Sequence, residues 1–372
     1  MNILIGGDFC ITPNYLDKSL FDSTVIELFN KSDYNIVNLE CPITKDIAEN
    51  KTLKTGPHLR SDERIINHLK DLNINAVTLA NNHLLDYGQK GLYDTFHTLL
   101  SHKISYVGAG KKCEEASKPL IVEIQNLKIA IVNFCENEWS IASTNEGGAN
   151  PLDIVDNTKQ IKEAKQLADF VIVIVHGGHE YYQLPSPRMV KQYRFFVDNG
   201  ADAVIGHHTH CFSGFEFYNN CPIAYSLGNM TFTLDSQYPV WYIGLLAQLN
   251  IEKNKPIEIT LLPIKQQAGN FHLTLLSNNE KNEVLNQIKA LSTVIQNPNK
   301  LQNEWNKYLV KRKNSLELFS PINFIPGRYV RAALKKLGFN KLLLKKNKLK
   351  NHLNYIRCES HRDIIIEIFK KL

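Results

Sequence analysis

The sequence lacks the features that mark secreted and membrane-spanning proteins. Its seven cysteines are odd in number and show no Cys-x-x-Cys spacing, so reduced thiols in a cytosolic protein are expected. No uninterrupted apolar stretch approaches the roughly 20 residues needed to cross a bilayer. The chain opens on MNILIGGD, without the basic leader of a signal peptide. These absences predict a cytoplasmic protein.

Acidic residues are missing from one stretch near the carboxyl terminus. Between Arg328 and Lys350 there are nine lysines and arginines and no aspartate or glutamate, while the net charge of the whole chain is only +6. Leucines and lysines interleave there, as in a helix that lies on an anionic membrane surface or contacts an acidic polymer or a synthase. A solvated helix packed on its leucines is the alternative. Aromatic residues spaced for base stacking are absent, so no nucleic-acid partner is expected.

The remaining composition is that of a globular protein, with 43% hydrophobic and 22% charged residues. Up to about His210, apolar runs alternate with helical patterns, which predicts a mostly parallel, layered α/β sheet. Closely spaced strands, expected to be antiparallel, follow to about Pro263, and helices are expected beyond about Ser277. We therefore predict one domain over residues 1–265 and a basic, mainly helical extension over residues 278–372.

The most informative stretch reads NGADAVIGHHTH. Its apolar run, Ala201–Ile205, is long enough for a buried strand and is followed, after one glycine, by His207, His208 and His210. Three such close histidines rarely serve packing, because their ring nitrogens must be satisfied, whereas neutral imidazole is the commonest protein metal ligand. We favour metal ligands at a strand end over the alternative, a polar turn after a core strand.

Four other apolar runs end in a similar way. Each stops on a carboxylate, an amide or an imidazole: Asp8, Glu40, Asn82 with His83, and His176. Because ligands bind at the carboxyl ends of strands in open α/β sheets, these termini can converge although they lie far apart in the chain. Together with His208 and His210 they offer two carboxylates, one amide and three imidazoles. That set is sufficient for two cations bridged by one carboxylate.

Two metals roughly 3.5 to 4 Å apart suit the hydrolysis of a phosphate ester, because they hold an oxyanion and activate a bound water. His83 follows the amide and can protonate the leaving oxygen, with Asp86 as its orienter. A core histidine, or one that supports a ligand, is the alternative. In a polar loop, His58 and Arg60 are expected to meet an anionic substrate, unless the loop is merely solvated. Asn229 can form a hydrogen bond near the site or simply occupy a turn.

Several motifs in order resemble the CapA/PgsA capsule-synthesis family, which is similar to the calcineurin-like metallophosphoesterases. The motifs are Gly7-Asp8, Asn38–Pro42, Ala80–His83 with Asp86 and Gly88, His176–Tyr181, Gly200–His210 and Ser226–Asn229. The resemblance covers roughly residues 1–265. It implies a layered, mostly parallel or mixed sheet sandwich of metallophosphoesterase type with helices outside.

The resemblance also implies roles for individual residues. One metal would be held by Asp8 and His210, the other by Asn82, His176 and His208, with Glu40 as the bridge and His83 as the leaving-group acid. The cofactors would be one or two divalent ions of manganese, iron or zinc. His179 and Glu180, which belong to the fourth motif, would contact the substrate.

The sequence departs from the superfamily's pattern at three places. Its first motif is Asp8-Phe9-Cys10 where the superfamily has Asp-x-His, so the first metal either loses a ligand or recruits Cys10. Glu40 stands where an aspartate usually bridges, and Gly177 where a tryptophan is expected, which opens space near the site. These departures predict a weaker first site or a different metal preference.

The combined features predict a metal-dependent, phosphoesterase-like hydrolase. Its substrate would be a phosphorylated precursor or polymer in the synthesis of a capsule, a surface polysaccharide or poly-γ-glutamate. One alternative is a non-enzymatic accessory protein that binds an acidic polymer. Another is a metal-dependent γ-glutamyl amide hydrolase, because a metal-activated hydroxide also attacks carbonyls. The basic stretch, residues 328–350, would place the protein at the membrane periphery.

Overall fold

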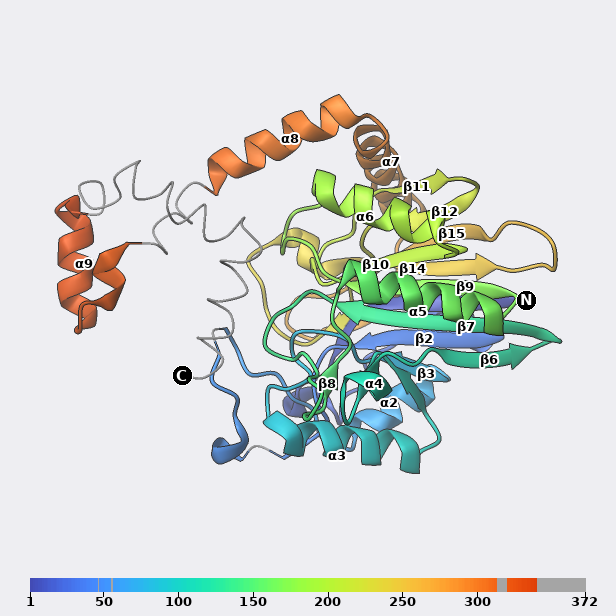
Figure 1. Ribbon diagram of the computed structural model, residues 1–372, viewed down its shortest axis with the longest axis horizontal. Coiled ribbons are helices and arrows are strands. Elements are labelled where there is room, and N and C mark those ends of the chain that lie inside the picture. The colour runs from blue at the N-terminus through green and yellow to red at the C-terminus, as the bar shows by residue number, and fades with distance from the viewer. Residues whose placement is uncertain (46, 55, 313–319, 340–372) are drawn as a thin grey trace. The chain divides into compact units, whose positions relative to one another are not determined.

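The computed structural model describes residues 1–372 except residues 46, 55, 313–319 and 340–372 (Figure 1). The chain divides into two compact units, Met1–Gln302 and Asn303–Leu372. The first unit carries every strand in the described part of the chain and every residue singled out above for the metal site.

The first sheet is built around β1 (Asn2–Cys10). Its parallel neighbours on one side follow in the order β2 (Tyr34–Leu39), β3 (Ala76–Thr78) and β4 (Ser105–Val107). On the other side, three strands continue the sheet in antiparallel order: β14 (Ile243–Asn250), β15 (Glu258–Gln266) and β16 (Leu273–Leu275). The short β13 (Asn229–Phe232) also pairs with β1, in parallel. The carboxyl ends of β1, β2 and β3 therefore point to the same edge of the sheet.

The second sheet has a parallel centre and antiparallel edges. Its strands follow in the order β11 (Phe215–Tyr218), β12 (Cys221–Ala224), β10 (Ala203–His207), β9 (Phe170–His176), β7 (Leu127–Cys135) and β6 (Leu120–Ile124). The four central strands are parallel, whereas β6 and β11 are antiparallel to their neighbours. A separate antiparallel pair consists of β5 (Ala109–Gly110) and β8 (Gly148–Ala149).

Most helices of the first unit pack on the outer faces of the two sheets (Figure 1). Those of the first unit are α1 (Ser23–Asn30), α2 (Ile65–Asp71), α3 (Gly88–Ser101), α4 (Cys113–Ala116), α5 (Ile154–Leu167), α6 (Pro187–Asp198) and α7 (Asn278–Ile295). Short 3-10 turns lie at Pro13–Tyr15, Ala48–Asn50 and Pro239–Tyr242. One core cluster joins α1, α2 and α3 to the first sheet, and another joins α5 and α6 to the second.

A third core cluster lies between the two sheets, so the architecture is a sandwich. Ile3 and Ile5 of β1 pack in it together with Ile172 and Ile174 of β9. The alternate residues of β9, such as Val173, pack under the helices instead. A strand covered on both faces reads as an uninterrupted apolar run, which explains why this one was recognisable in the sequence. The predicted layered α/β sandwich with outer helices is confirmed.

Three details differ from the expectations. β3 ends at Thr78, so that Asn82 and His83 lie on the turn that follows the strand rather than at its last residues. The predicted ligands converge from the facing edges of two sheets, not from one open sheet. The strands beyond residue 210 are mostly antiparallel as expected, but β12 and β13 pair in parallel with β10 and β1.

The compact first unit extends beyond the boundary at residue 265 that the motifs indicated. Val284 and Ile288 of α7 pack in the inter-sheet cluster, and the Ser292 hydroxyl accepts a hydrogen bond of 3.0 Å from the Phe215 backbone N–H. The helix expected to open the extension therefore belongs to the sandwich, and the structure divides the chain after Gln302.

Beyond α7 the structure describes α8 (Pro298–Lys311), a 3-10 turn at Pro321–Phe324 and α9 (Arg328–Lys336). Residues 340–350 of the basic stretch, and the rest of the expected helical extension to residue 372, lie outside the described residues. No helix in the described part of the chain is both long and apolar enough to span a membrane.

Candidate metal centre

The edges of the two sheets bring the predicted ligands together. The first sheet supplies Asp8 from β1, Glu40 directly after β2 and Asn82 from the turn after β3. The second supplies His176 at the end of β9 and, just after β10, His208 and His210. All six side chains are buried. Strand polarity and sheet packing thus bring possible metal ligands from distant parts of the chain together in one buried site.

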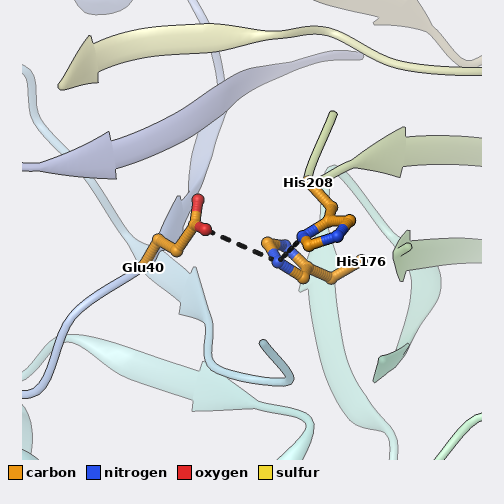
Figure 2. A group of neighbouring side chains, drawn as sticks. All are labelled: Glu40, His176 and His208. Atoms are coloured by element: carbon orange, nitrogen blue, oxygen red, sulfur yellow. Dashed lines mark hydrogen bonds and ion pairs between the residues drawn. The ribbon is translucent and has the colours of Figure 1, made fainter. Parts of the chain in front are cut away.

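Within this set the structure forms two groups whose ligand atoms lie within 4.8 Å of one another. Figure 2 shows the first group, Glu40 with His176 and His208. The second group is Asp8, Glu40 and His210. Glu40 belongs to both, with its Oε1 atom 3.6 Å from His176 Nε2 and 3.7 Å from His210 Nε2. This is the arrangement expected of a carboxylate that bridges two cations.

The Glu40 side chain fits a cation because its oxygens accept no hydrogen bond from the part of the chain that the structure describes. It is fully buried, and neither carboxylate oxygen has a hydrogen-bond partner among the described residues. Burial, followed by the charges of Asp8 and Glu180, raises the pKa of Glu40 well above its usual range. A buried carboxylate without a partner is costly, and a divalent ion on its oxygens would remove that cost.

Asp8 is held as a carboxylate. Its Oδ1 atom accepts a hydrogen bond of 2.8 Å from the Asn38 side-chain amide. Nδ1 of His207 lies 3.5 Å from Oδ1, and Nδ1 of His210 lies 3.5 Å from Oδ2. Burial opposes the charge, but the neighbouring rings of His207 and His210 outweigh it and hold the pKa of Asp8 well below its usual range.

The first group contains a close cluster of three ligand atoms. Nε2 of His176 lies 3.0 Å from Nδ1 of His208 and 3.1 Å from Oδ1 of Asn82. Burial and then the neighbouring His208 lower the pKa of His176 well below its ordinary value. The ring is therefore neutral, which is the form that binds metals. The side-chain oxygen of Asn82 thus lies beside the first group.

The backbone around the two histidines after β10 is strained. His208 and His210 have φ angles of 87° and 54°, in the left-handed region that costs a non-glycine residue on the order of 1–3 kcal/mol. Gly206 is required just before them, because a Cβ there would lie 2.2 Å from the carbonyl oxygen of Tyr225. Such strain persists where the surrounding structure enforces it, and it is concentrated at functional sites.

Asn229 orients one of the ligands. Its side-chain oxygen lies 2.9 Å from Nδ1 of His210, and its amide donates a hydrogen bond of 3.0 Å to the carbonyl oxygen of Trp241. β13 also pairs Asn229 directly with Asp8. A hydrogen bond near the site was one of the two roles expected of Asn229, and these contacts direct its amide to the ring of His210 in the second group.

The predicted acid and its orienter are paired. Nδ1 of His83 lies 2.7 Å from Oδ2 of Asp86, and both side chains are buried. Burial lowers the pKa of His83, although Asp86 acts in the opposite direction. Sequence reasoning missed Lys54, whose ammonium forms a salt bridge with Asp86 Oδ1 in a side chain only 2% exposed. The only available signal was its position in the polar loop that holds His58.

The residues expected to contact substrate are placed as follows. Nε2 of His58 lies 2.7 Å from the carbonyl oxygen of Thr52, in its own loop. Arg60 donates to the carbonyl oxygen of Thr44 at 3.4 Å.

His179 is half-buried and Glu180 is exposed, in the segment that follows β9. The charge of Glu180 contributes to the pKa shifts of both Glu40 and His210. The structure thus associates Glu180 with the metal centre.

Two further groups near the centre bear on the expectations. Oε1 of Glu138, from the loop after β7, lies 4.0 Å from Nε2 of His208 and was not identified from the sequence. Cys10 belongs to neither ligand group. A hydrogen bond with Cys41, together with burial, raises the pKa of the Cys10 thiol well above its usual range. Because Cys10 lies in neither group, the described residues bring no thiol to the place of the first-motif histidine.

The fold and the site place this chain among α/β sandwich proteins with a potential site for two cations, because two buried groups of possible ligands share one carboxylate. The chain belongs to the family described as bacterial capsule synthesis protein PGA_cap, whose model matches residues 9–234. It is 33% identical over 240 residues to the PGA biosynthesis protein CapA of Bacillus subtilis. The aligned region covers 64% of this chain and 62% of that protein. It is 30% identical over 264 residues to the capsule biosynthesis protein CapA of Bacillus anthracis, covering 69% and 64%. The chain thus spans less than two thirds of either relative's length.

Two of the solved structures that superpose on this chain are described as enzymes. One is described as a novel phosphatase from Mycoplasma pneumoniae, with a TM-score of 0.43, 15% identity, and coverage of 73% of this chain and 95% of that one. The other is a 5'-nucleotidase precursor from Thermus thermophilus, with a TM-score of 0.41, 13% identity, and coverage of 80% and 60%. At these TM-scores the similarities carry no information about what this chain does.

Proposed function

We propose that this protein is a metal-dependent hydrolase of phosphate esters. The observation that carries the proposal is the position of Glu40, a buried carboxylate without a hydrogen-bond partner among the described residues that is shared by two ligand groups. When bound, two divalent ions of manganese, iron or zinc would supply an activated water and neutralise the charge of the leaving oxygen.

The roles of the side chains follow from their positions. Asp8 and His210 would hold one ion, with Glu40 shared between the two ions, while Asn229 and Asn38 fix the orientation of the His210 and Asp8 side chains. The other ion falls to the cluster of His176, His208 and Asn82. Because all these groups are buried, water is excluded from the ligand side of the site, which strengthens each electrostatic contact.

His83 donates the proton to the leaving oxygen. The Asp86 carboxylate, 2.7 Å from Nδ1 of His83, stabilises the imidazolium form that this role requires and fixes the ring. Nε2 is then the atom that transfers the proton, because Nδ1 is engaged by Asp86.

The proposed substrate is a phosphorylated precursor or polymer in the assembly of a capsule, a cell-surface polysaccharide or poly-γ-glutamate. The names of the Bacillus relatives support this context. A second candidate function is that of a non-enzymatic accessory protein that binds an acidic polymer. It is favoured by a relative from Mycobacterium tuberculosis, 28% identical over 54% of this chain, that is named a probable polyglutamine synthesis accessory protein. Hydrolysis of a γ-glutamyl amide is a weaker candidate that the same ions would support.

We also propose that residues 328–350 contact an anionic membrane surface. Within α9, the residues Tyr329, Val330 and Ala333 share one face at 3.6 residues per turn, and the bases Arg328, Arg331 and Lys335 lie on the other. No residue of α9 is buried, and Tyr329 is 83% exposed. An exposed helix with an apolar and a basic face suits the interface of an anionic bilayer.

Metal analysis followed by a substrate screen tests the main proposal. We expect protein prepared without chelator to carry one or two equivalents of transition metal and to hydrolyse phosphorylated sugars or nucleotides. Metal-loaded protein that hydrolyses no phosphate ester but binds poly-γ-glutamate would favour the accessory role. Release of glutamate from γ-glutamyl peptides would favour the amidase. Protein that binds no metal on titration would exclude both hydrolase candidates.

A further inference from the structure

We infer that Lys54 is a positioning residue of the proposed active site. Its side chain holds Asp86 against His83, and it also fastens its own loop to the turn that carries His83. The structural part of this inference stands on the contacts below. Its catalytic consequence rests on the proposed function.

The Lys54 ammonium is buried in a specific arrangement. Its side chain is 2% exposed, it forms a salt bridge with Oδ1 of Asp86, and its nitrogen lies 3.1 Å from Nδ1 of His83. Lysine is almost never fully buried unless it is paired. The pair is therefore unlike the exposed surface ion pairs elsewhere in the chain, such as that of Lys90 with Asp94.

Lys54 helps to hold the Asp86 carboxylate in one orientation. The second carboxylate oxygen of Asp86, Oδ2, accepts a hydrogen bond of 2.6 Å from the Leu59 backbone N–H and lies 2.7 Å from Nδ1 of His83. With Lys54 on one oxygen and two groups on the other, the carboxylate plane cannot rotate. Because Asp86 in turn holds His83, the direction of the imidazole ring depends on Lys54.

The same turn holds the loop at a second place. The Thr52 backbone N–H donates a hydrogen bond of 3.1 Å to the carbonyl oxygen of Asp86, and the Thr52 hydroxyl donates to the carbonyl oxygen of Leu85. The loop is thus attached to the turn at three of its residues, Thr52, Lys54 and Leu59. Lys54 supplies the only charged contact among these three attachments.

Two roles for Lys54 other than positioning make different predictions. A lysine that contacts the phosphate of the substrate would contribute to binding, so its loss would raise KM. A lysine that only balances the charge of Asp86 would be dispensable once that charge is removed. A positioning residue would instead contribute to kcat, because misplacement of an acid group by a fraction of an ångström slows the chemical step.

The test compares full-length variants. Lys54→Met removes the ammonium at similar length, Lys54→Gln keeps a hydrogen-bond donor, and the double variant Lys54→Met with Asp86→Asn removes both charges. Lys165→Met is the control for removing a lysine from an ion pair elsewhere, because Lys165, on α5, forms a partly exposed salt bridge of 2.7 Å with Asp202. The readouts are metal content, hydrogen exchange of the segment that contains the Leu59 amide, and kcat and KM for an alkyl phosphate.

We expect Lys54→Met to keep its metal and to speed exchange at the Leu59 amide by about tenfold or more. Its kcat should fall by about tenfold to a hundredfold, with KM within about twofold. Lys54→Gln should be intermediate, the double variant no better than Lys54→Met, and the control unchanged. If Lys54→Met does not fold, Lys54→Gln carries the same test.

Three outcomes would overturn the inference. They are unchanged exchange at Leu59, a raised KM with unchanged kcat, and full recovery of kcat in the double variant. If the metal-loaded parent hydrolyses no ester at all, the proposed function fails. The exchange experiment then still decides whether Lys54 fastens the loop and Asp86.

Discussion

Oε1 of Glu40 lies 3.6 Å from Nε2 of His176, although the two residues come from different sheets (Figure 2). The separation is too long for a hydrogen bond, and neither carboxylate oxygen has a hydrogen-bond partner among the described residues. Two sheets that pack face to face thus bring an unpaired acid and a neutral imidazole to the same point. A cation between them would satisfy both, so the joint between the sheets and the proposed metal centre coincide.

This relationship predicts opposite effects of one substitution with and without metal. In chelator-treated protein, Glu40→Gln should raise the free energy of unfolding by about 1–3 kcal/mol, because it removes a buried acid that has no hydrogen-bond partner and whose ionisation next to Asp8 is costly. In untreated protein, the same substitution should lower the bound metal at least about tenfold, because the bridging carboxylate is lost. Denaturant unfolding and elemental analysis check the two effects.

Glu138→Gln is the matched control for Glu40→Gln, because Glu138 is a partly exposed carboxylate at the edge of the same site. It should change the stability of the metal-free protein little. A Glu40→Gln protein with the metal content of the parent would show that Glu40 is not a bridging ligand.

The second prediction separates proton donation from metal binding. His83→Ala should retain metal, whereas His208→Ala should weaken its binding, because only His208 belongs to a ligand group. General-acid catalysis contributes on the order of a hundredfold to ten-thousandfold, so His83→Ala should slow hydrolysis of an alkyl phosphate by about that range. An activated aryl phosphate needs little protonation of its leaving group and should be affected less.

Steady-state kinetics with both esters, on protein of measured metal content, provide the check. Equal losses on the alkyl and aryl esters would argue against an acid role for His83. Loss of metal from His83→Ala would instead place this histidine among the ligands.

The sequence predicted which side chains gather at the candidate site because strand-end residues are visible in it. Apolar runs that stop on Asp8, Glu40 and His176 identify both the strands and what they carry, and strand polarity then brings those ends together. The apolar runs do not reveal to which of the two sheets each strand belongs. The two-sheet sandwich depends on inter-sheet packing of residues such as Ile5 and Ile172, whose chemistry is the same on either face.

The supporting residues could not be predicted for a different reason. Lys54 and Glu138 lie on loops, where no periodicity fixes the direction of a side chain. Asn229 was noticed, but its role depends on the parallel pairing of β13 with β1, a contact between segments more than two hundred residues apart that leaves no local signal. The end of the compact unit was missed because the apolar positions of α7 look like those of any amphipathic helix.

The third prediction concerns the end of that unit. A chain that stops at Lys311 should fold and bind metal like the full chain, whereas a chain that stops at Ser277 should be markedly destabilised. The latter loses Val284, Ile288 and Ile295, which are nearly fully buried and contribute roughly 1.5–3 kcal/mol each. Thermal unfolding and metal titration of the two truncated proteins measure the difference.

The outcome decides which division of the chain is right. Equal stability and equal metal binding of the two truncations would support a domain that ends near residue 265, as the motifs alone indicated. Failure of both truncations would show that residues beyond Lys311 are needed for folding.

The last prediction tests the membrane contact through α9. Full-length protein should bind vesicles that contain phosphatidylglycerol and not vesicles of phosphatidylcholine alone, and added salt should weaken the binding. Neutralising Arg331, Lys335 and Lys336 to glutamine should lower the partition coefficient about a hundredfold, because each basic residue near an anionic surface contributes about 1 kcal/mol. Co-sedimentation at several lipid concentrations gives the coefficient.

A matched control separates this surface from net charge. Changing the exposed Lys162, Lys253 and Lys289 to glutamine removes the same charge from the first unit and should leave binding within about twofold. Val330→Ser should weaken binding without any change of charge, because the apolar face of α9 is then less able to enter the bilayer interface. Equal losses in the two triple variants would show that only net charge matters. Equal binding to both kinds of vesicle would contradict an electrostatic membrane contact.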